Sequence, residues 1–365
     1  MAKRHWISLW NLGGALAACM MAVGVTVLHA ATGANADLLK VAQGVFQPLP
    51  KDMATPKFPI TPERLALGRD LYFDPRISID GTVSCARCHQ PALYGTDGLP
   101  KPRGAHDKLN PRNAPTILNA ALQFKEHWRG DRENVEDQAK QALIGPPSFG
   151  DSDYATAMAK IKAIPGYAEM FRKAFPGDAD PITPNNWGKA IGAYERNLIT
   201  PSRFDKFLAG DVQALSPAER TGLRKFIDTG CIACHNGPGV GGGMFQKFGV
   251  VEDYWKETGS NPVDKGRFDV THKPEDMYVF KVPGLRNVAM TPPYFHDGSV
   301  RSLAGAVRIM AKVQLGKSLS DQDAQEIVTF LQSLTGKLPD DFANAPALPA
   351  AGFEPTKTAS TDHQK

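Results

Sequence analysis

Cysteine is scarce in this chain, and four of its five cysteines lie in two short motifs. The motifs are SCARCHQ at residues 84–90 and GCIACHN at 230–236, and the fifth cysteine is Cys19. An exported protein would normally use four cysteines as two disulfides. Here each pair of cysteines is separated by two residues and followed by a histidine, which argues against a disulfide framework.

The chain also lacks a large excess of charge. Its formal net charge is +4, and no dense cluster of lysine and arginine occurs. Nucleic-acid-binding surfaces are basic patches or stripes, so we predict no nucleic-acid partner. With 42% hydrophobic and 22% charged residues, the composition excludes wholesale disorder, and 365 residues are enough for two domains with buried cores.

The N-terminus predicts export. A basic start at residues 3–5 precedes an apolar run over about 12–28, and Ala34-Asn35-Ala36 fits a cleavage site between small residues. We therefore assign residues 1–36 to a signal peptide. An uncleaved membrane anchor is one alternative, because the run is nearly long enough to span a bilayer. A lipoprotein anchor at Cys19 is the other, although the residues after it stay apolar.

Alternating strand patterns are scarce, and helical patterns dominate. Thr61-Pro62 precedes one amphipathic segment, and the capping box Ser216-Pro217-Ala218-Glu219 precedes another. Each segment continues into one of the cysteine motifs, so the chain contains an internal repeat. Periodicity predicts further helices at 133–143, 154–163, 167–175, 184–198, 299–311 and 320–335.

The predicted fold is mainly α, with two domains and long loops between the helices. We place the boundary near Thr200-Pro201, which gives domains at 37–200 and 201–338. The Gly- and Pro-rich segment 236–298 is expected to be a long packed loop region. A mobile tail is expected over 339–365, where alanine and proline are frequent.

Three chemistries compete for the two motifs. A zinc ribbon usually has its two cysteine pairs about 15–20 residues apart, and these pairs are much farther apart. A redox dithiol of the thioredoxin type needs a βαβ context, which is absent. Covalent c-type haem needs two thiols and an adjacent histidine, and both motifs meet this requirement. The thioether residues are then Cys85, Cys88, Cys231 and Cys234, and the proximal iron ligands are His89 and His235.

The sixth iron ligand decides whether a haem carries electrons or reacts. In the second half the candidates are Met244, Met277, Met290, Met310, His272 and His296. Met310 precedes the last predicted helix, where a cytochrome c unit has its axial methionine, but a single methionine is as often core filler. The first half has no comparably placed methionine. There His106 is either a ligand that leaves the iron in one state or a surface histidine.

Distinctive motifs extend from about residue 45 to 337. They include LYFDPRIS, GTVSCARCH, GTDG, PRNAPT, EDQAK, IPGY, AFPGD, GCIACHNG, YVFKVPGLRNVAMTPPYFHDG and QLGK. With these motifs the sequence resembles the bacterial di-haem cytochrome c peroxidases and the related di-haem enzyme of methylamine utilisation. The resemblance implies two cytochrome-c-like domains, each with one covalently bound haem c, and a cytochrome-c peroxidase activity.

The resemblance also implies different roles for the two haems. The C-terminal haem would receive electrons, with His235 and Met310 as its ligands. The N-terminal haem would react with hydrogen peroxide, with His89 as the permanent ligand and His106 as the ligand that leaves. Trp128 matches a tryptophan between the haems and would relay electrons; without the resemblance it would be ordinary packing.

Further ligands and partners follow from the same resemblance. A calcium ion would bind at the domain interface to the Asn113 side chain and to the backbone carbonyls of Thr291 and Pro293. Without the resemblance, Asn113 would merely cap a turn. The implied electron donor is a small cytochrome c or a cupredoxin, the implied assembly is a homodimer, and the expected location is the periplasm.

One departure from the family pattern concerns the peroxide pocket. The family uses a glutamine and a glutamate there, and Gln138 matches the glutamine. The glutamate position falls near Ser148 or Phe149, and neither residue is an acid. General acid–base help is typically worth about 100- to 10,000-fold in rate, so its loss would slow peroxide reduction unless another group serves.

The nearby acids do not fill this gap in the sequence. Asp151 and Asp153 are several residues away from the required position. Glu133 and Glu136 are expected on a solvated face of the predicted helix at 133–143.

Two alternatives to a peroxidase therefore stay open. One is a di-haem electron carrier that has lost catalysis, which the missing glutamate favours. The other is an oxidase that acts on a partner protein, as in the methylamine-utilisation relative. That relative has tyrosine in place of the axial methionine, so Met310 argues against this alternative.

Overall fold

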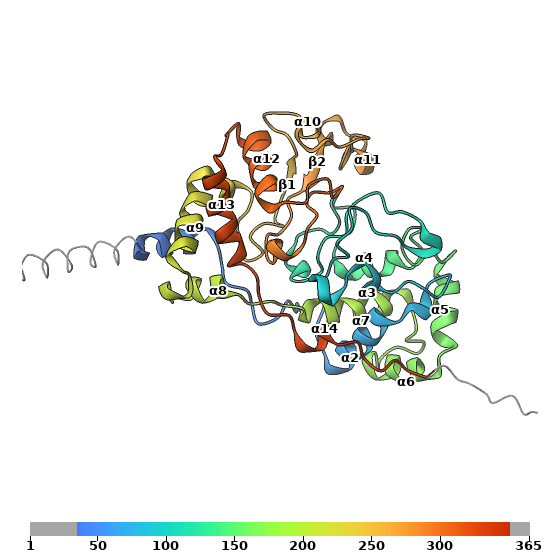
Figure 1. Cartoon of the computed structure of the whole chain (residues 1–365). Helices are drawn as coiled ribbons and strands as arrows, with labels where there is room; N and C mark the ends of the chain where they lie inside the picture. Colours follow the sequence, from blue (N-terminus) through green and yellow to red (C-terminus); the bar gives the residue numbers. More distant parts are fainter. Residues whose placement is uncertain (1–34, 351–365) are drawn as a thin grey trace, which may run out of the picture.

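A computed structural model describes residues 35–350 of the chain. The predicted signal peptide, with Cys19, lies almost wholly outside this range, as do residues 351–365 of the predicted tail. The described part is mainly helical, as predicted (Figure 1). Between residues 35 and 350, no helix is both long and apolar enough to cross a bilayer.

The helices divide between the two halves of the chain. After a helical segment at 35–45, the first half contains α2 (Pro62–Phe73), α3 (Cys85–Cys88), α4 (Val135–Ala142), α5 (Tyr154–Lys162), α6 (Pro165–Ala174) and α7 (Pro184–Asn197). The second half contains α8 (Arg203–Leu208), α9 (Pro217–Thr229), α10 (Tyr254–Thr258), α11 (Phe268–Thr271), α12 (Leu303–Leu315), α13 (Asp321–Gln332) and α14 (Asp340–Ala343). Strands β1 (Phe245–Lys247) and β2 (Val279–Lys281) pair antiparallel within the predicted loop region.

The two helices for which the sequence predicts an N-cap residue begin where expected. The Thr61 hydroxyl accepts the backbone N–H of Arg64 at the start of α2. Ser216 and Glu219 form the predicted capping box of α9. Helix α12 begins at Leu303, later than the predicted residue 299, because the Ser302 side chain caps it.

Both halves use the same close helix crossing. Helix α2 packs on α7, and α9 packs on α13. A Cβ atom added at Gly68 of α2 would lie 1.9 Å from the carbonyl oxygen of Ala190, and one added at Gly222 of α9 would lie 2.0 Å from that of Glu326. These contacts are possible only for glycine. The sequence repeat is therefore also a structural repeat, in which each crossing precedes a cysteine motif.

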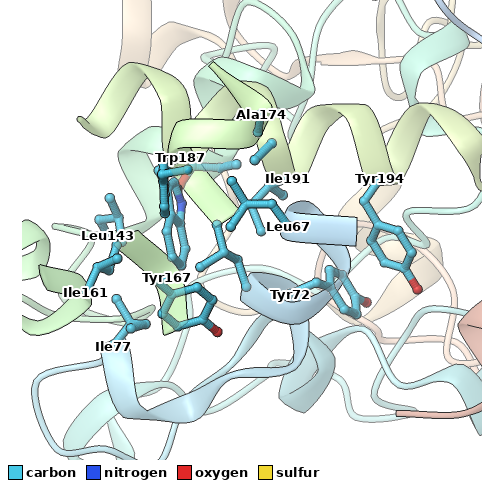
Figure 2. Close-up of a cluster of buried hydrophobic side chains, with 14 of the residues drawn as sticks. Leu67, Tyr72, Ile77, Leu143, Ile161, Tyr167, Ala174, Trp187, Ile191 and Tyr194 are labelled. Atoms are coloured by element: carbon cyan, nitrogen blue, oxygen red, sulfur yellow. Dashed lines mark hydrogen bonds between the residues drawn. The ribbon is translucent and has the colours of Figure 1, made fainter. Parts of the chain in front are cut away.

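The core of the first half lies around α2 and α7 (Figure 2). Leu67, Tyr167, Trp187 and Ile191 are fully buried there. The indole N–H of Trp187 donates to the carbonyl oxygen of Ala139, 3.2 Å away, which ties α7 to α4. This contact brings α4, with Gln138, against the rest of the half.

The N-terminal helical segment belongs to the core of the second half. Leu38, Ala42 and Phe46 are buried among the side chains of α8, α9 and α13. The Phe46 ring packs edge-on against Phe204, with 5.3 Å between centroids. In Figure 1 this segment lies beside α9, far from α2. The second half therefore completes its core with residues from the beginning of the chain.

The C-terminal segment, which begins within the tail predicted from residue 339, packs against the first half of the chain. Phe342 of α14 is fully buried in the core of the first half, 6.0 Å from the Tyr72 ring. Arg69 donates to the carbonyl oxygen of Asp341, and Arg76 donates to that of Pro349. The Phe342 ring and these hydrogen bonds thus attach residues 339–350 to the first half of the chain, despite their content of alanine and proline.

The predicted boundary near Thr200 is a buried junction. Thr200 is fully buried, and its hydroxyl oxygen accepts hydrogen bonds from the side chains of Asn119 and Asn287, each 2.8 Å long. The Asn287 side chain in turn accepts the backbone N–H of Gly336. Both halves of the chain are therefore fastened at the same buried hydroxyl.

Replacing Gly68 by alanine should destabilise the protein. The new Cβ would force α2 and α7 apart, and overpacking of this kind costs about 1–3 kcal/mol. Denaturant unfolding of the holoprotein would measure the change. Gly44→Ala is the matched control, because Gly44 is also helical but nothing lies within 4 Å of its added Cβ. Equal stability of the Gly68→Ala variant and the wild type would contradict the close crossing.

Candidate functional site

The second cysteine motif opens into a cavity of about 260 Å³. Cys231, Cys234 and His235 line it from the end of α9, and Met310 lines it from α12. Of the six candidates for a sixth ligand in this half, only Met310 and His296 line this cavity within the described range. The structure therefore brings the predicted pair His235 and Met310 to one site.

The protonation of this motif suits haem attachment better than thiolate chemistry. Burial lowers the pKa of His235 to about 4, so its imidazole is neutral and keeps a lone pair for a metal. Burial also raises the pKa of Cys231 to about 11. Redox-active cysteines have lowered pKa values, so this environment argues against a reactive dithiol.

The first motif lines a separate cavity of about 320 Å³, together with Gln138 and Ser148. His89 caps the short helix α3. Its Nδ1 lies 3.0 Å from the carbonyl oxygen of Gly95, so Nδ1 carries the proton and Nε2 is left free to bind a metal. The Tyr72 hydroxyl donates to the backbone carbonyl of His89 over 2.6 Å and fixes the motif from the α2 side.

The two cavities fit one c-type haem each. The four cysteines of the motifs are unpaired, and they lie in two places rather than one. Within residues 35–350, no group of three or more His, Cys, Asp or Glu side chains could hold a metal ion, which removes the four-cysteine zinc ribbon. The His235 cavity instead combines two thiols and a neutral histidine. The His89 cavity has Cys88 and His89 in its wall, and Cys85 lies at the other end of the short helix α3. Burial raises the pKa of Cys85 and Cys88 as well.

His106 does not line the His89 cavity. Its side chain is 55% exposed, and its backbone is left-handed with φ of 53°. The Asp80 carboxylate accepts the backbone N–H of His106 at 2.7 Å, which holds the loop in this outward position. The role of His106 as a ligand that leaves the iron stays a prediction.

Trp128 lies between the cavities and lines both of them, as does His127. The Trp128 indole N–H donates to the carbonyl oxygen of Asn113, 3.0 Å away, and its own carbonyl accepts the backbone N–H of Lys281. The backbone N–H of Asn113 donates to the carbonyl of His296. The indole is thereby fixed by both halves of the chain.

The three predicted calcium ligands come together. Asn113, Thr291 and Pro293 all line the His235 cavity, and Asn113 also lines the His89 cavity. The Asn113 side chain is buried, and its amide N–H₂ donates to the carbonyl of Leu99. This set offers an amide and backbone carbonyls, the oxygen chemistry that calcium prefers.

Three acids that lie near Gln138 or Ser148 in the sequence do not line the His89 cavity. Asp151 is buried in an ion pair with Lys160, and Asp153 caps α5. Glu133 is exposed, as expected.

The expectation for Glu136 was wrong. Glu136 is buried and forms a bidentate ion pair with Arg196, with N–O distances of 2.5 and 2.9 Å. The physical reason is Gly192 of α7: a Cβ there would lie 2.5 Å from the Glu136 side chain, so glycine leaves the space that the carboxylate fills.

Sequence reasoning gave no role to several titratable residues that line the His89 cavity. Among them are Glu126, His127, Asp131 and Glu195. Glu195 carried one available signal, because it interrupts the apolar pattern of the predicted helix at 184–198. Glu126 and His127 lie in irregular structure, where periodicity gives no information about burial.

Comparisons with known proteins agree with this geometry. The model of the family "Di-haem cytochrome c peroxidase" matches residues 62–213. The cytochrome c551 peroxidase of Pseudomonas aeruginosa is 40% identical over 337 residues, which cover 91% of this chain and 96% of that protein. The methylamine utilization protein MauG of Methylorubrum extorquens is 32% identical, with 88% and 93% covered.

A solved structure supports the same assignment. The crystal structure of a MauG-like protein associated with microbial copper homeostasis matches with a TM-score of 0.70 and 28% identity, over 82% of this chain and 97% of that one. Sequence, cavities and relatives lead to one conclusion: the chain is a member of the di-haem cytochrome c peroxidase family.

Proposed function

We propose that this chain is a periplasmic peroxidase that reduces hydrogen peroxide to water with electrons from a small cytochrome c or a cupredoxin. The observation that supports this proposal most is that Trp128 lines two cavities, each of which has its own Cys-x-x-Cys-His motif. Relatives named cytochrome c peroxidases, at 38–40% identity, support the activity. The basic and apolar N-terminal sequence supports export.

The His235 cavity is the proposed site of electron entry. Bound haem supplies the redox chemistry in both cavities. His235 and Met310 would hold the iron here, and a methionine ligand raises the reduction potential, which suits a group that accepts electrons from a donor. Trp128, which lines both cavities, would carry the electrons from the C-terminal haem to the N-terminal haem. We also infer a homodimer, on the family resemblance alone.

The His89 cavity is the proposed site of peroxide reduction. His89 would hold the iron through its anchored imidazole, and Gln138 would orient peroxide from α4. The outward position of His106 supports a resting state in which peroxide has access. Calcium at Asn113, Thr291 and Pro293 would link the two halves of the chain, because Asn113 belongs to the first half and the other two residues belong to the second.

The proposal predicts peroxide turnover. Holoprotein that has been reduced by one electron, with calcium present, should oxidise reduced cytochrome c when hydrogen peroxide is added. The decay of the donor's absorbance measures the rate. Trp128→Phe should lower this rate, since phenylalanine keeps the packing but removes the indole and its hydrogen bond to Asn113. Absence of turnover in the wild type would reject the peroxidase function.

A second prediction concerns the electron-entry ligand. Met310→Leu preserves the side-chain volume but removes the sulfur, so the reduction potential of the C-terminal haem should fall. A spectroscopic redox titration would measure this potential. Met290→Leu is the control, because Met290 is exposed and does not line the cavity. Unchanged potential in the Met310→Leu variant would exclude methionine ligation.

Ser148 favours one alternative function, a di-haem electron carrier without catalysis. It lines the His89 cavity where the family has an acid. A carrier should keep six ligands on both irons in every redox state, whereas a peroxidase should expose one iron after partial reduction. We expect a high-spin ferric signal in the electron paramagnetic resonance spectrum of the half-reduced protein. A purely low-spin spectrum would instead support the carrier.

A further inference from the structure

Glu195 places a buried carboxyl group against the His89 cavity. It lies in the last turn of α7, is only 4% exposed, and lines the cavity together with Gln138 and Ser148. No residue within the described range donates a hydrogen bond to its carboxylate. Burial has the largest effect on the pKa of this group, and neighbouring charges come second. A buried carboxylate without a donor is costly, so such a group is stable only as the neutral acid.

The charges around Glu195 also favour the neutral acid. Two further carboxylates, Glu126 and Glu136, lie close enough to act on it. The nearest cation, Arg196, is already engaged by Glu136 in a bidentate ion pair. Lys281 lies 3.8 Å from Glu126. Burial, and then the two carboxylates, raise the pKa of Glu195 well above its ordinary value.

We propose that Glu195 is the proton donor of the His89 cavity and takes the place of the acid that is absent at Ser148. This inference rests on the proposed peroxidase function. Reduction of one hydrogen peroxide breaks the O–O bond and takes up two electrons and two protons to give two waters. The donor protein supplies the electrons. Glu195 gives one proton to the departing oxygen and becomes a carboxylate, and solvent supplies the second proton. Glu195 then recovers a proton from solvent before the next turnover.

Each element packed around Glu195 carries a titratable or charged group that interacts with its carboxyl group. They are Tyr72 on α2, Cys85 on α3, Glu126 in the loop before α4, Glu136 on α4, and Tyr194 and Arg196 on α7. Burial keeps Tyr72 and Cys85 neutral near physiological pH, and the thioether of a haem-bound Cys85 does not titrate. Glu126 is the remaining variable group, because burial raises its pKa to about 7.

The first test measures stability against pH in holoprotein of the wild type and of Glu195→Gln. Glutamine has the size and shape of the neutral acid, so the variant should fold. The folded wild type keeps a proton at Glu195 that the unfolded chain releases above its ordinary pKa of 4.5. The wild type should therefore lose stability relative to the variant as the pH rises from about 5 to 8, by up to tenfold in the folding equilibrium constant per pH unit.

The second test measures kcat/KM for hydrogen peroxide from pH 5 to 8. Loss of a general acid should lower it by about 100-fold or more in Glu195→Gln, and Glu195→Asp should recover part of the loss. Glu169→Gln is the control. Glu169 is a helical carboxylate on α6, half exposed and paired with Arg172 and Lys173, so neither kcat/KM nor the pH dependence of stability should change.

The outcomes are distinct. A pH-dependent stability difference together with lowered kcat/KM supports the proposal. A constant stability difference overturns it, because glutamine would then act only through packing, and unchanged kcat/KM overturns the donor role. Failure of the wild type to turn over peroxide rejects the peroxidase function itself, whereas failure of this inference leaves wild-type turnover intact.

Discussion

The hydrogen bonds around Trp128 are the constraint on which the rest of the site depends. The indole donates to Asn113, the Asn113 backbone donates to His296, and Lys281 donates to the Trp128 carbonyl. These bonds join the loop before α4 to the strand β2 and to the segment before α12. Because the bonded groups are rigid backbone and a large ring, the separation of the two cavities is fixed by hydrogen bonds between rigid groups rather than by flexible side chains.

The two halves repeat one framework but build opposite electrostatic environments on it. In each half a capped helix with a central glycine crosses a later long helix, α7 or α13, and leads into a cysteine motif. The second half then surrounds its cavity with apolar groups and Met310. The first half places two buried acids, Glu126 and Glu195, in the wall of its cavity, beside an ion-paired cluster of Asp131, Arg129 and Arg132. A sulfur ligand in an apolar setting suits electron storage, and buried acids suit chemistry that consumes protons.

Local signals predicted much of this framework. The caps at Thr61 and Ser216, the helical periodicity and the two motifs depend on residues close in sequence, and the structure has the helices near those positions. Burial of Glu136 was missed because it depends on the space left by Gly192, in a helix far along the chain. Glu195 was missed for the same reason, because its burial and its two neighbouring carboxylates depend on other segments. Spacing within one segment cannot reveal charges that meet only after folding.

The crossed chain ends have a consequence for the order of folding during synthesis. Phe46 is among the first described residues to be made, yet it belongs to the core that contains Phe204 and Phe330. Phe342 is among the last, yet it fills the core around Tyr72. Domains usually fold one after another as they leave the ribosome or a translocation channel. Here neither core is complete until almost the whole chain has emerged, so the first half must wait for its final aromatic ring while its cysteine motif is still accessible.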